Sequence, residues 1–278
     1  MKPIPHKGAP LIMEKIGLFA SGDRFSHIAF QEIKKRGFLP VVFSFEKPSF
    51  PDNKNEIILT FGDIEAFIKH ARSLNITRVV FAGKMYMSDI FKKKIAISGS
   101  NFLARIKRFN SENILNNLVG FLEQNHIKTI PLTTIFNEYL VQEKLYTSTI
   151  PTTFQWKDIY TGWGIAKQVA KMNIGQSVAV KNGIVAAVEA IEGTNDMIKR
   201  AGGLCSDFVV IKVIKNNQDV RFDLPTIGPI TIRTISRAKG KIIAVEAGKT
   251  VMVDAKNTVA LAEKLNIGIV GFKGKEIR

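Results

Sequence analysis

The segment from Asp219 to Pro229 sets acidic side chains and an arginine among prolines and a glycine. Pro225 restrains the residue before it to extended backbone and lacks an N–H donor. The glycine and proline that end the segment predict a turn into a helix. Such a segment can hold side chains rigidly at the rim of a sheet, so Asp223 is a candidate reaction-centre residue. Alternatively, Asp223 caps the local backbone or pairs with Arg221, and the spacing alone does not choose.

A second acidic stretch follows a predicted strand. Glu189, Glu192 and Asp196 offer oxygen ligands of the kind that Mg²⁺ binds, and Gly193 would let the backbone approach a phosphate. The alternative places Thr194 at a helix N-cap, with these acids exposed or in the first helical turn. The spacing by itself favours this second interpretation.

A third stretch has Glu246 and Lys249 on either side of Gly248, in a bend between two predicted strands. The bend is either a further phosphate-binding corner or a plain turn with a surface ion pair. Three corners in one half of the chain, each combining an acid, a base and glycine or proline, are less expected as a coincidence. They favour a common site.

Other catalytic patterns are weak. The four histidines and Cys205 lack the spacing of a zinc site, and no serine nucleophile elbow is present. The loop from Gly17 to Gly22 follows the first predicted strand but lacks G-x-G-x-x-G, and Asp23 puts a negative charge where a pyrophosphate would lie. A dinucleotide cofactor is therefore not favoured, which leaves oxygen-ligand chemistry in the second half.

The composition indicates a globular protein with an anionic partner. Of the 278 residues 45% are hydrophobic and 23% charged, and 40 Lys and Arg against 24 Asp and Glu give a net charge of +16. This charge suits a nucleic acid, a phosphorylated substrate or an anionic membrane surface. The densest basic cluster is interpreted as a solvated face; it comprises Lys92–Lys94, Arg105, Lys107 and Arg108.

The cellular compartment follows from what the sequence lacks. A single cysteine excludes an internal disulfide and fits a reducing compartment. Residues 1–10 hold three prolines and no apolar run, so we expect a loose tail over residues 1–13 and no signal peptide. No apolar run is long enough to span a bilayer. We expect a cytoplasmic protein, and the sequence leaves the oligomeric state open, a homodimer included.

Alternating strand and helix patterns predict an α/β protein of two domains. A Rossmann-like domain with a parallel sheet is expected over residues 14–142, and a Thr- and Ser-rich linker over 143–157. Its predicted strands are 15–21, 39–45, 56–60, 78–83 and 128–132, with helices near 25–33, 64–74, 89–97 and 111–125.

Residues 158–278 predict a second, mixed α/β domain. The β-rich runs Ser177–Lys181 and Ile184–Glu189 flank Asn182-Gly183, which predicts a β-hairpin with a type I′ turn. The other predicted helices are 158–172, 194–200, 231–238 and 255–265, and the other strands are 208–214, 241–247, 250–254 and 267–272.

Several motifs of the second half resemble a known family. They are Lys181-Asn182-Gly183, the stretch 188–194, Arg200-Ala201-Gly202-Gly203, Arg221 to Pro229 with Thr231, the stretch 245–250, and Asp158-Ile159 with Gly162 and Ala166. In this order they look like the UDP-2,3-diacylglucosamine pyrophosphatases of lipid A biosynthesis, of the type unrelated to calcineurin-like hydrolases. The N-terminal loop departs from the family pattern at Ala20–Ser26.

The resemblance implies a fold, a reaction and a catalytic residue. The fold is a Rossmann-like domain followed by a distinct α/β domain. The reaction is Mg²⁺-dependent (or Mn²⁺-dependent) hydrolysis of UDP-2,3-diacylglucosamine to 2,3-diacylglucosamine 1-phosphate (lipid X) and UMP, by attack at the β-phosphorus. The family's catalytic aspartate falls on Asp223. Glu189 and Glu192 are the further acids that we expect at the metal.

The remaining roles complete the hypothesis. The expected substrate-binding residues are Lys181, Gly193, Thr194, Arg200, Arg221, Thr226 and Lys249. The diacylated substrate and the basic charge suit peripheral binding to an anionic inner-membrane surface, on its cytoplasmic face. The alternatives are a Rossmann-type sugar-nucleotide or dinucleotide enzyme and a nucleic-acid-binding protein. The latter would show a basic stripe interleaved with exposed aromatics, whereas most of the 19 phenylalanines fall at core-periodic positions, so no nucleic-acid partner is expected.

Overall fold

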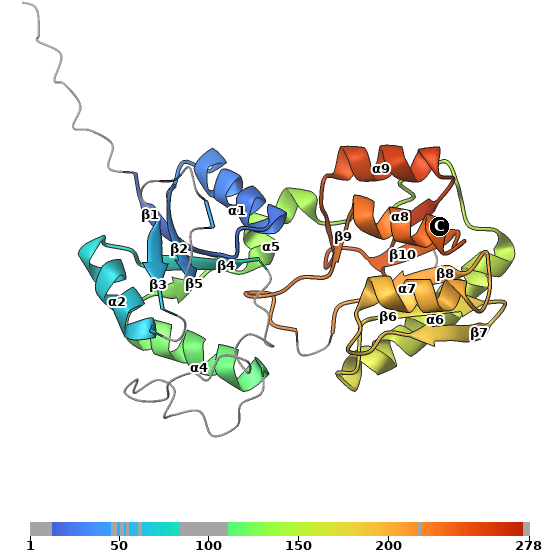
Figure 1. Ribbon diagram of the computed structural model, residues 1–278, viewed down its shortest axis with the longest axis horizontal. Helices are drawn as coiled ribbons and strands as arrows, with labels where there is room; N and C mark the ends of the chain where they lie inside the picture. The colour runs from blue at the N-terminus through green and yellow to red at the C-terminus, as the bar shows by residue number, and fades with distance from the viewer. Residues whose placement is uncertain are drawn as a thin grey trace, which may run out of the picture. The chain divides into compact units, whose positions relative to one another are not determined.

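A computed structural model of the chain describes residues 13–45, 49, 50, 53, 56–60, 63–83, 111–215 and 218–274. The chain forms two compact units, residues 1–135 and 136–278, and each is described by itself (Figure 1). The predicted helix at 89–97 and the basic cluster at Lys92–Lys94, Arg105, Lys107 and Arg108 lie outside the described residues. So does the predicted tail, apart from its last residue.

The N-terminal unit is built on a parallel sheet. Its described strands are β1 (Lys15–Ala20), β2 (Leu39–Phe45), β3 (Ile57–Leu59), β4 (Arg78–Ala82) and β5 (Lys128–Thr129). They lie in the order β3-β2-β1-β4-β5, all parallel. The described helices are α1 (Arg24–Lys35), α2 (Ile64–Ser73), α4 (Ser111–Gln124) and α5 (Leu132–Ile135). This order, which reverses at β1, confirms the predicted Rossmann-like sheet.

Phenylalanines fill the centre of this unit. The ring of Phe19 stacks on Phe81, with 4.6 Å between centroids, and lies 4.7 Å from the ring of Phe67. The rings of Phe43 and Phe67 meet edge to face at 4.8 Å, and both side chains are fully buried. These rings therefore belong to the core, as the periodicity predicted.

The C-terminal unit contains a mixed sheet in the order β12-β10-β8-β6-β7. Its strands are β6 (Ser177–Lys181), β7 (Ile184–Val188), β8 (Val209–Lys212), β10 (Ile242–Glu246) and β12 (Gly268–Phe272). Strands β8, β10 and β12 are parallel, whereas β6 runs antiparallel to both of its neighbours. The predicted hairpin is confirmed: Asn182 (φ 52°) and Gly183 (φ 77°) both have the positive φ that a type I′ turn requires.

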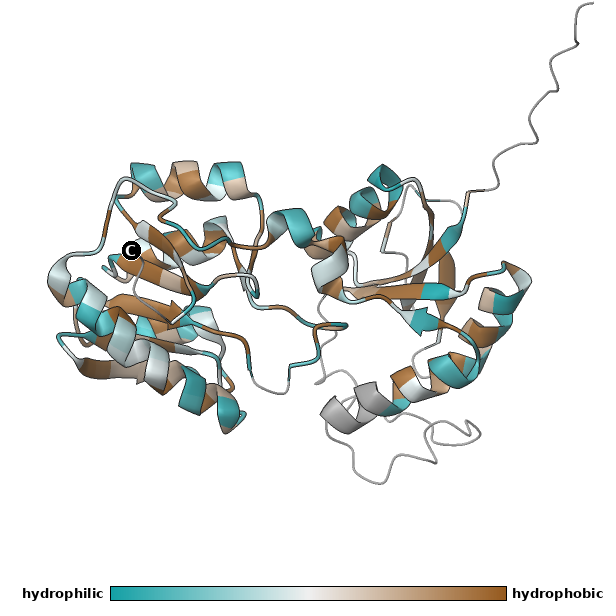
Figure 2. Cartoon of the chain, turned by 180° about the vertical axis from the view of Figure 1, so that it is seen from behind, coloured by the Kyte–Doolittle hydropathy of each residue, from teal (hydrophilic) through white to brown (hydrophobic). Residues whose placement is uncertain are grey.

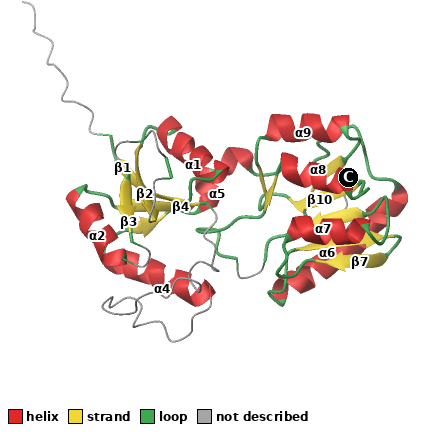
Figure 3. Cartoon of the chain, in the orientation of Figure 1, coloured by secondary structure: helices red, strands yellow, loops and turns green. Residues whose placement is uncertain are grey.

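Helices cover both faces of this sheet. On one face α6 (Thr153–Lys171) buries Ile159, Ala166 and Val169 against the strands. On the other lie α7 (Thr194–Gly202), α8 (Pro229–Arg237) and α9 (Ala255–Lys264), seen together in Figure 3. Figure 2 shows the hydrophobic colour concentrated along the strands and the packed helix sides. The sheet is thus packed on both faces by hydrophobic clusters, and its polar side chains lie at the strand ends.

A second, two-stranded sheet anchors the loop that carries Asp223. Strand β9 (Thr226–Ile227) pairs in parallel with β11 (Val251–Met252), and the N–H of Val251 donates to the carbonyl of Pro225 at 2.8 Å. The predicted turn into a helix is present, but α8 begins at Pro229, two residues before the predicted start. Pro229 occupies the first helical turn, where a missing N–H costs nothing.

The stretch predicted as a linker is bound to the C-terminal unit. The N–H of Tyr146 donates to Ile269 O at 2.9 Å, and the hydroxyl of Thr147 accepts from the N–H of Ile269 at 2.9 Å. Thr152 forms a capping box with Gln155, so α6 begins at Thr153 and not at Asp158. Thr and Ser resemble a linker in the sequence, yet here they satisfy backbone groups at element ends. The boundary between the units falls earlier, after Ile135.

Candidate functional site

One edge of the C-terminal sheet gathers polar side chains from four strands. Strands β8 and β10 end there with Lys212 and Glu246, Glu189 directly follows β7, and β6 begins there with Ser177. The register pairs Ser177 with Lys212 directly. In open α/β sheets ligands bind outside the carboxyl ends of the parallel strands. This carboxyl edge, as we term it, is therefore the candidate site.

A buried polar network crosses the carboxyl edge. The hydroxyl of Thr194 donates to Glu189 Oε2 at 3.2 Å and lies 3.3 Å from Ser177 Oγ. Lys212 Nζ donates to Thr194 Oγ1 at 3.2 Å and to Thr226 O at 3.0 Å. Glu189, Ser177 and Lys212 are all buried. The network therefore joins two predicted substrate residues, Thr194 and Thr226, to the predicted metal ligand Glu189.

Asp223 lies in the loop between β8 and β9. Its side chain has access to solvent, yet the protein packed around the carboxylate desolvates it, and this burial raises its pKa above the ordinary value. The charges of Lys212 and Lys215 act in the opposite direction, with smaller contributions from the Leu224 N–H and the Gln218 side chain. Gln218 Nε2 donates to Asp223 Oδ2 at 2.7 Å. Asp223 is thus a carboxylate held in place beside two lysines.

Asp219 takes the structural roles that the sequence had offered to Asp223. Arg221 Nη2 lies 2.6 Å from Asp219 Oδ2, its Nε lies 2.9 Å from Asp219 Oδ1, and the Arg221 N–H donates to the same Oδ1 at 3.0 Å. Burial alone would raise the pKa of Asp219, but these contacts with Arg221 outweigh it and the pKa is lowered. Arg221 is thus paired with Asp219, and Asp223 is not needed to neutralise it.

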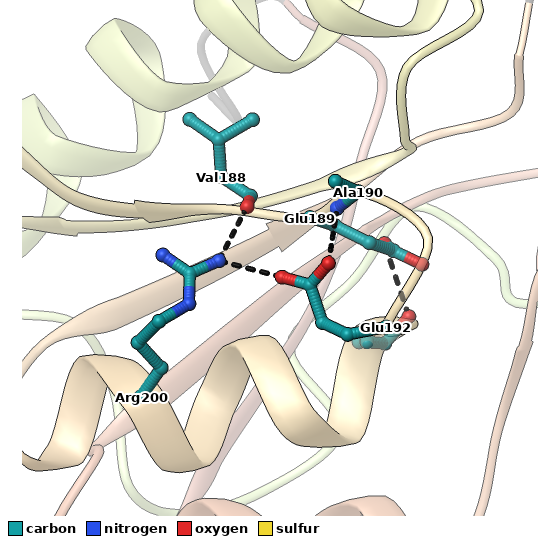
Figure 4. A network of polar contacts seen from close by, with 6 residues as sticks. Val188, Glu189, Ala190, Glu192 and Arg200 are labelled. Carbon is teal, nitrogen blue, oxygen red and sulfur yellow. Dashed lines mark hydrogen bonds and ion pairs between the residues drawn. The ribbon is translucent and has the colours of Figure 1, made fainter.

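Glu192 and Arg200 neutralise each other beside the β7–α7 loop (Figure 4). Arg200 Nη2 donates to Glu192 Oε1 at 2.6 Å and to Val188 O at 2.8 Å, and Glu192 Oε2 accepts from the Ala190 N–H at 3.1 Å. The hydrogen bond from Arg200 is the main reason that the pKa of Glu192 is lowered. This pair closes the loop that leads to Gly193.

Gly193 shapes the start of α7. Its φ of 84° and ψ of 168° belong to a region that only glycine adopts readily, and a Cβ there would meet nothing within 4 Å. No side chain caps this helix end, all of which lies in the described part of the chain. Because no side chain caps this helix start, its first N–H groups could donate to an anion.

Lys181 lies at the opposite edge of the sheet. It ends β6, four residues beyond Ser177, which corresponds to about 13 Å along a strand. Its Nζ contacts Asp207 O at 3.3 Å. The structure therefore does not bring Lys181 to the carboxyl edge, and its predicted role in phosphate binding has no support from this geometry.

In the third predicted corner, Glu246 has a structural role, whereas Lys249 is exposed. Glu246 Oε2 binds Lys167 Nζ at 2.5 Å and accepts from the Ile214 N–H at 2.9 Å, so it anchors the start of the β8–β9 loop. Lys249 is exposed in the turn that follows, next to Gly248 at φ 75°. The ion pair of this corner thus involves Lys167 on α6, and Lys249 remains at the carboxyl edge as a predicted phosphate ligand.

Two of the three carboxylates predicted to bind a metal ion already have hydrogen-bonding partners. Among the described residues, no three His, Cys, Asp or Glu side chains are grouped closely enough to hold a metal ion. Glu192 is paired with Arg200, and Glu189 accepts from Thr194. A three-carboxylate set of Asp223, Glu189 and Glu192 is therefore not assembled. Asp223 alone fits the other common arrangement, in which Mg²⁺ uses one or two carboxylates together with substrate phosphates.

In the N-terminal unit, the loop between β1 and α1 contains an aspartate, Asp23, that caps the following helix. Asp23 Oδ1 accepts from the Ser26 N–H at 2.8 Å and from the Ser26 hydroxyl at 3.0 Å, which caps α1. Ser26 Oγ also donates to Ala82 O at 2.7 Å, across to β4. The helix end that binds pyrophosphate in a dinucleotide fold is therefore occupied by a carboxylate.

Comparison with known proteins identifies the family. A model described as the LpxI N-terminal domain matches residues 15–139, and one described as the LpxI C-terminal domain matches residues 142–270. The chain belongs to the LpxI family. The N-terminal model covers the parallel sheet, and the C-terminal model covers the carboxyl edge and the motifs that resembled the family. The family resemblance is therefore confirmed.

Two individual proteins were compared. The chain is 27% identical over 282 residues to UDP-2,3-diacylglucosamine pyrophosphatase LpxI of Caulobacter vibrioides, which covers 95% of this chain and 99% of that protein. The solved structure of the Bordetella bronchiseptica enzyme WbmH in complex with NAD⁺ aligns with a TM-score of 0.31 and 13% identity, over 94% of this chain and 75% of that chain. A likeness this weak carries no argument about the LpxI-family chain described here.

Sequence reasoning missed two residues of the site, and it named Asp158 only as part of a family motif, without its structural role. Lys212 and Ser177 join the network, and buried Asp158 on α6 accepts from the N–H groups of Asn182 (3.0 Å) and Gly183 (2.6 Å) to fix the hairpin turn. A lysine within the otherwise apolar strand 208–214 was the available signal for Lys212. Separately, no helix in the described ranges has the length and apolarity needed to cross a membrane.

Proposed function

We propose that this chain hydrolyses the pyrophosphate bond of UDP-2,3-diacylglucosamine to 2,3-diacylglucosamine 1-phosphate (lipid X) and UMP, in lipid A biosynthesis. The observation that carries the proposal is the match of both LpxI domain models in order, together with a relative of that activity aligned over 95% of the chain. The carboxyl edge supplies side chains suited to this chemistry.

Asp223 is the proposed catalytic residue. Hydrolysis needs a positioned water, and a carboxylate within reach of that water can accept its proton. Asp223 takes a proton from the water as its oxygen attacks the β-phosphorus. The bond from that phosphorus to the bridging oxygen breaks, and UMP leaves with the bridging oxygen.

Mg²⁺ (or Mn²⁺) is the proposed cofactor. When bound, it neutralises charge on the non-bridging phosphate oxygens. Asp223 is the side chain placed to hold it together with the substrate phosphates. To bind the metal ion as well, Glu189 would have to give up its hydrogen bond from the hydroxyl of Thr194, and Glu192 would have to give up its ion pair with Arg200.

The substrate phosphates are proposed to bind along the same edge. The N–H groups that follow Gly193 and the hydroxyl of Thr194 offer neutral donors, and Lys249 offers a charge. Arg221 and Arg200 would each exchange a carboxylate partner for a phosphate, and Arg221, which binds Asp219 through both Nε and Nη2, could bind the phosphate in the same forked geometry. Thr226 would take part through its hydroxyl, which would exchange the carbonyl of Leu224 for a phosphate oxygen.

Peripheral membrane binding is proposed for substrate access. The substrate carries two acyl chains, and a net charge of +16 favours an anionic inner leaflet, at about 1 kcal/mol for each basic residue near the surface. The protein would then work on the cytoplasmic face of the inner membrane. Sedimentation with vesicles of increasing anionic lipid content should carry down more protein, and binding indifferent to that content would contradict this account.

A single incubation tests the proposed activity. The chain is mixed with UDP-2,3-diacylglucosamine and Mg²⁺, with and without EDTA, and UMP and lipid X are measured. We expect both products in equal amounts with Mg²⁺ and their loss with EDTA. Failure to cleave the substrate in Mg²⁺ would overturn the function, whereas cleavage that EDTA leaves unchanged would overturn only the metal requirement.

A further inference from the structure

Lys212 is a buried lysine at the carboxyl edge. It is the last residue of β8, its exposure is 6%, and the three residues before it are fully buried and apolar. Removing an ammonium group from water costs several kcal/mol unless partners replace the lost hydration. A lysine that merely ended a strand could reach solvent along its flexible stem. Its burial therefore calls for an explanation in what it contacts.

The contacts of Lys212 tie together separate parts of the site. Its Nζ donates to the hydroxyl of Thr194, the first residue of α7, and to the carbonyl of Thr226 in β9. Both bonds, at 3.2 Å and 3.0 Å, run between segments that are distant in the sequence. Through these two bonds Lys212 fixes the first turn of α7 and the start of β9 relative to the main sheet. Loss of the ammonium group would remove both links.

The same bonds control the loop that carries Asp223. That loop leaves the main sheet at Lys212 and ends at Thr226 in the two-stranded sheet, and the bond from Lys212 to the carbonyl of Thr226 joins its two ends. Asp223 lies three residues before the returning end, and the positive charge of Lys212 acts on its carboxylate. Through Thr194 the network also reaches Glu189.

We propose that Lys212 is a positioning residue for the reaction, which holds Asp223 and Thr194 in one geometry by closing the β8–β9 loop onto α7. This inference rests on the proposed function. Lys212 contributes a fixed charge and two fixed hydrogen bonds, and it transfers no proton. Its removal should therefore lower kcat, because the groups that act in the transition state are no longer aligned, more than it weakens substrate binding.

The test replaces the ammonium group by an apolar group of similar length. In Lys212→Met we expect kcat to fall about 100-fold with KM within about threefold of the unaltered chain. The Tm is expected to fall, since removing one charge from a buried network leaves its partners uncompensated, so the kinetics are measured well below the Tm of the variant. The matched control is Lys171→Met, which removes an exposed lysine at the end of α6 and should leave kcat, KM and Tm unchanged.

A second variant covers the case in which Lys212→Met fails to fold. Lys212→Cys in a Cys205→Ala background is alkylated while unfolded, either with 2-bromoethylamine, which restores an ammonium group, or with iodoethane, which adds a neutral chain, and is then refolded. Recovery of kcat by the ammonium adduct alone is the expected result. Equal recovery by both adducts would overturn the proposal, because packing alone would then explain the role of Lys212.

The outcomes separate this inference from the proposed function. Lack of turnover by the unaltered chain would overturn the proposed function and this inference with it. Normal turnover by Lys212→Met, or a rise in KM at unchanged kcat, would overturn this inference alone.

Discussion

Helices α1 and α2 of the N-terminal unit begin differently from helices α7 and α8 of the C-terminal unit. In the N-terminal unit α1 and α2 are capped by aspartates: Asp23 accepts from the Ser26 N–H at 2.8 Å, and Asp63 from the Ala66 N–H at 2.9 Å. In the C-terminal unit α7 and α8 begin after glycines, and no side chain caps either one, both helix starts being fully described. A capped start is satisfied within the chain, whereas an uncapped one offers its N–H groups to an anion.

This difference teaches where binding capacity lies in a chain of two α/β sheets. The N-terminal sheet has the strand order of a nucleotide-binding fold, yet an acid fills the helix start at its reversal point. In the C-terminal unit the starts of α7 and α8 are open, and Lys212, Thr194 and Asp223 lie nearby. Sheet topology alone would favour the N-terminal unit as the place for an anion, whereas the side chains at these helix starts favour the C-terminal unit.

The largest effect is expected at Asp223. Asp223→Asn should lower kcat by about 10³-fold, since the proton acceptor is lost while the shape is kept. Because burial raises the pKa of this carboxylate, its charged form opposes folding above that pKa, so the neutral variant should keep or raise the Tm at neutral pH. Steady-state kinetics and thermal unfolding on the same preparation check both expectations. Activity close to that of the unaltered chain would remove Asp223 from the reaction.

The next effect concerns the open start of α7. Gly193→Ala should destabilise the C-terminal unit by about 2 kcal/mol, because alanine must adopt a backbone conformation that glycine alone accepts readily. We also expect kcat/KM to fall as the first turn of α7 shifts. Urea unfolding and kinetics measure these changes. Gly164→Ala in the middle of α6 is the matched control, with equal open space and an ordinary helical backbone, and it should stabilise slightly. An equal response of both variants would contradict the role given to Gly193.

A smaller effect, on stability alone, is expected in the N-terminal unit. Asp23→Ala removes the cap of α1 and should cost about 1 kcal/mol of folding free energy. Hydrolysis of UDP-2,3-diacylglucosamine should continue at the rate of the unaltered chain, because we propose no substrate contact at this helix start. Differential scanning calorimetry and the standard assay test the two halves of this prediction. A large loss of activity without unfolding would place the N-terminal loop in the site.

The smallest effect is expected from the exposed pair of Glu192 and Arg200. Glu192→Gln should lower the Tm less than Asp23→Ala, because solvent screens the pair. The folded-state pKa of Glu192 is lowered, so its contribution is present at neutral pH and is lost as the pH falls through that value. The Tm difference between Glu192→Gln and the unaltered chain should therefore vanish in acid. A difference that persists at low pH would show that the ion pair is not its source.

Much of the fold was predictable because the signals are local. Continuous apolar strands between amphipathic helices indicated the parallel sheet, and Asn182-Gly183 indicated the hairpin. The stretch at 143–157 misled because Thr147 and Thr152 act as hydrogen-bonding groups at element ends, which composition alone does not distinguish from a linker.

The site was predictable only in part. Arg221 lies two residues from both Asp219 and Asp223, so spacing could not choose the partner that the structure shows to be Asp219. The hairpin itself contained the information that separates Lys181 from Glu189, because one precedes the turn and the other lies at the far end of β7. Lys212 meets Thr194 and Thr226 only after β6, β8 and β9 are arranged in space, which no local pattern encodes.

The central claim is that the carboxyl edge directs water to the β-phosphorus of UDP-2,3-diacylglucosamine. Hydrolysis in H₂¹⁸O with Mg²⁺, followed by mass spectrometry of both products, tests this most directly. We expect one ¹⁸O atom in the phosphate of lipid X and none in UMP. Label in UMP, or release of UDP in place of UMP, would contradict it.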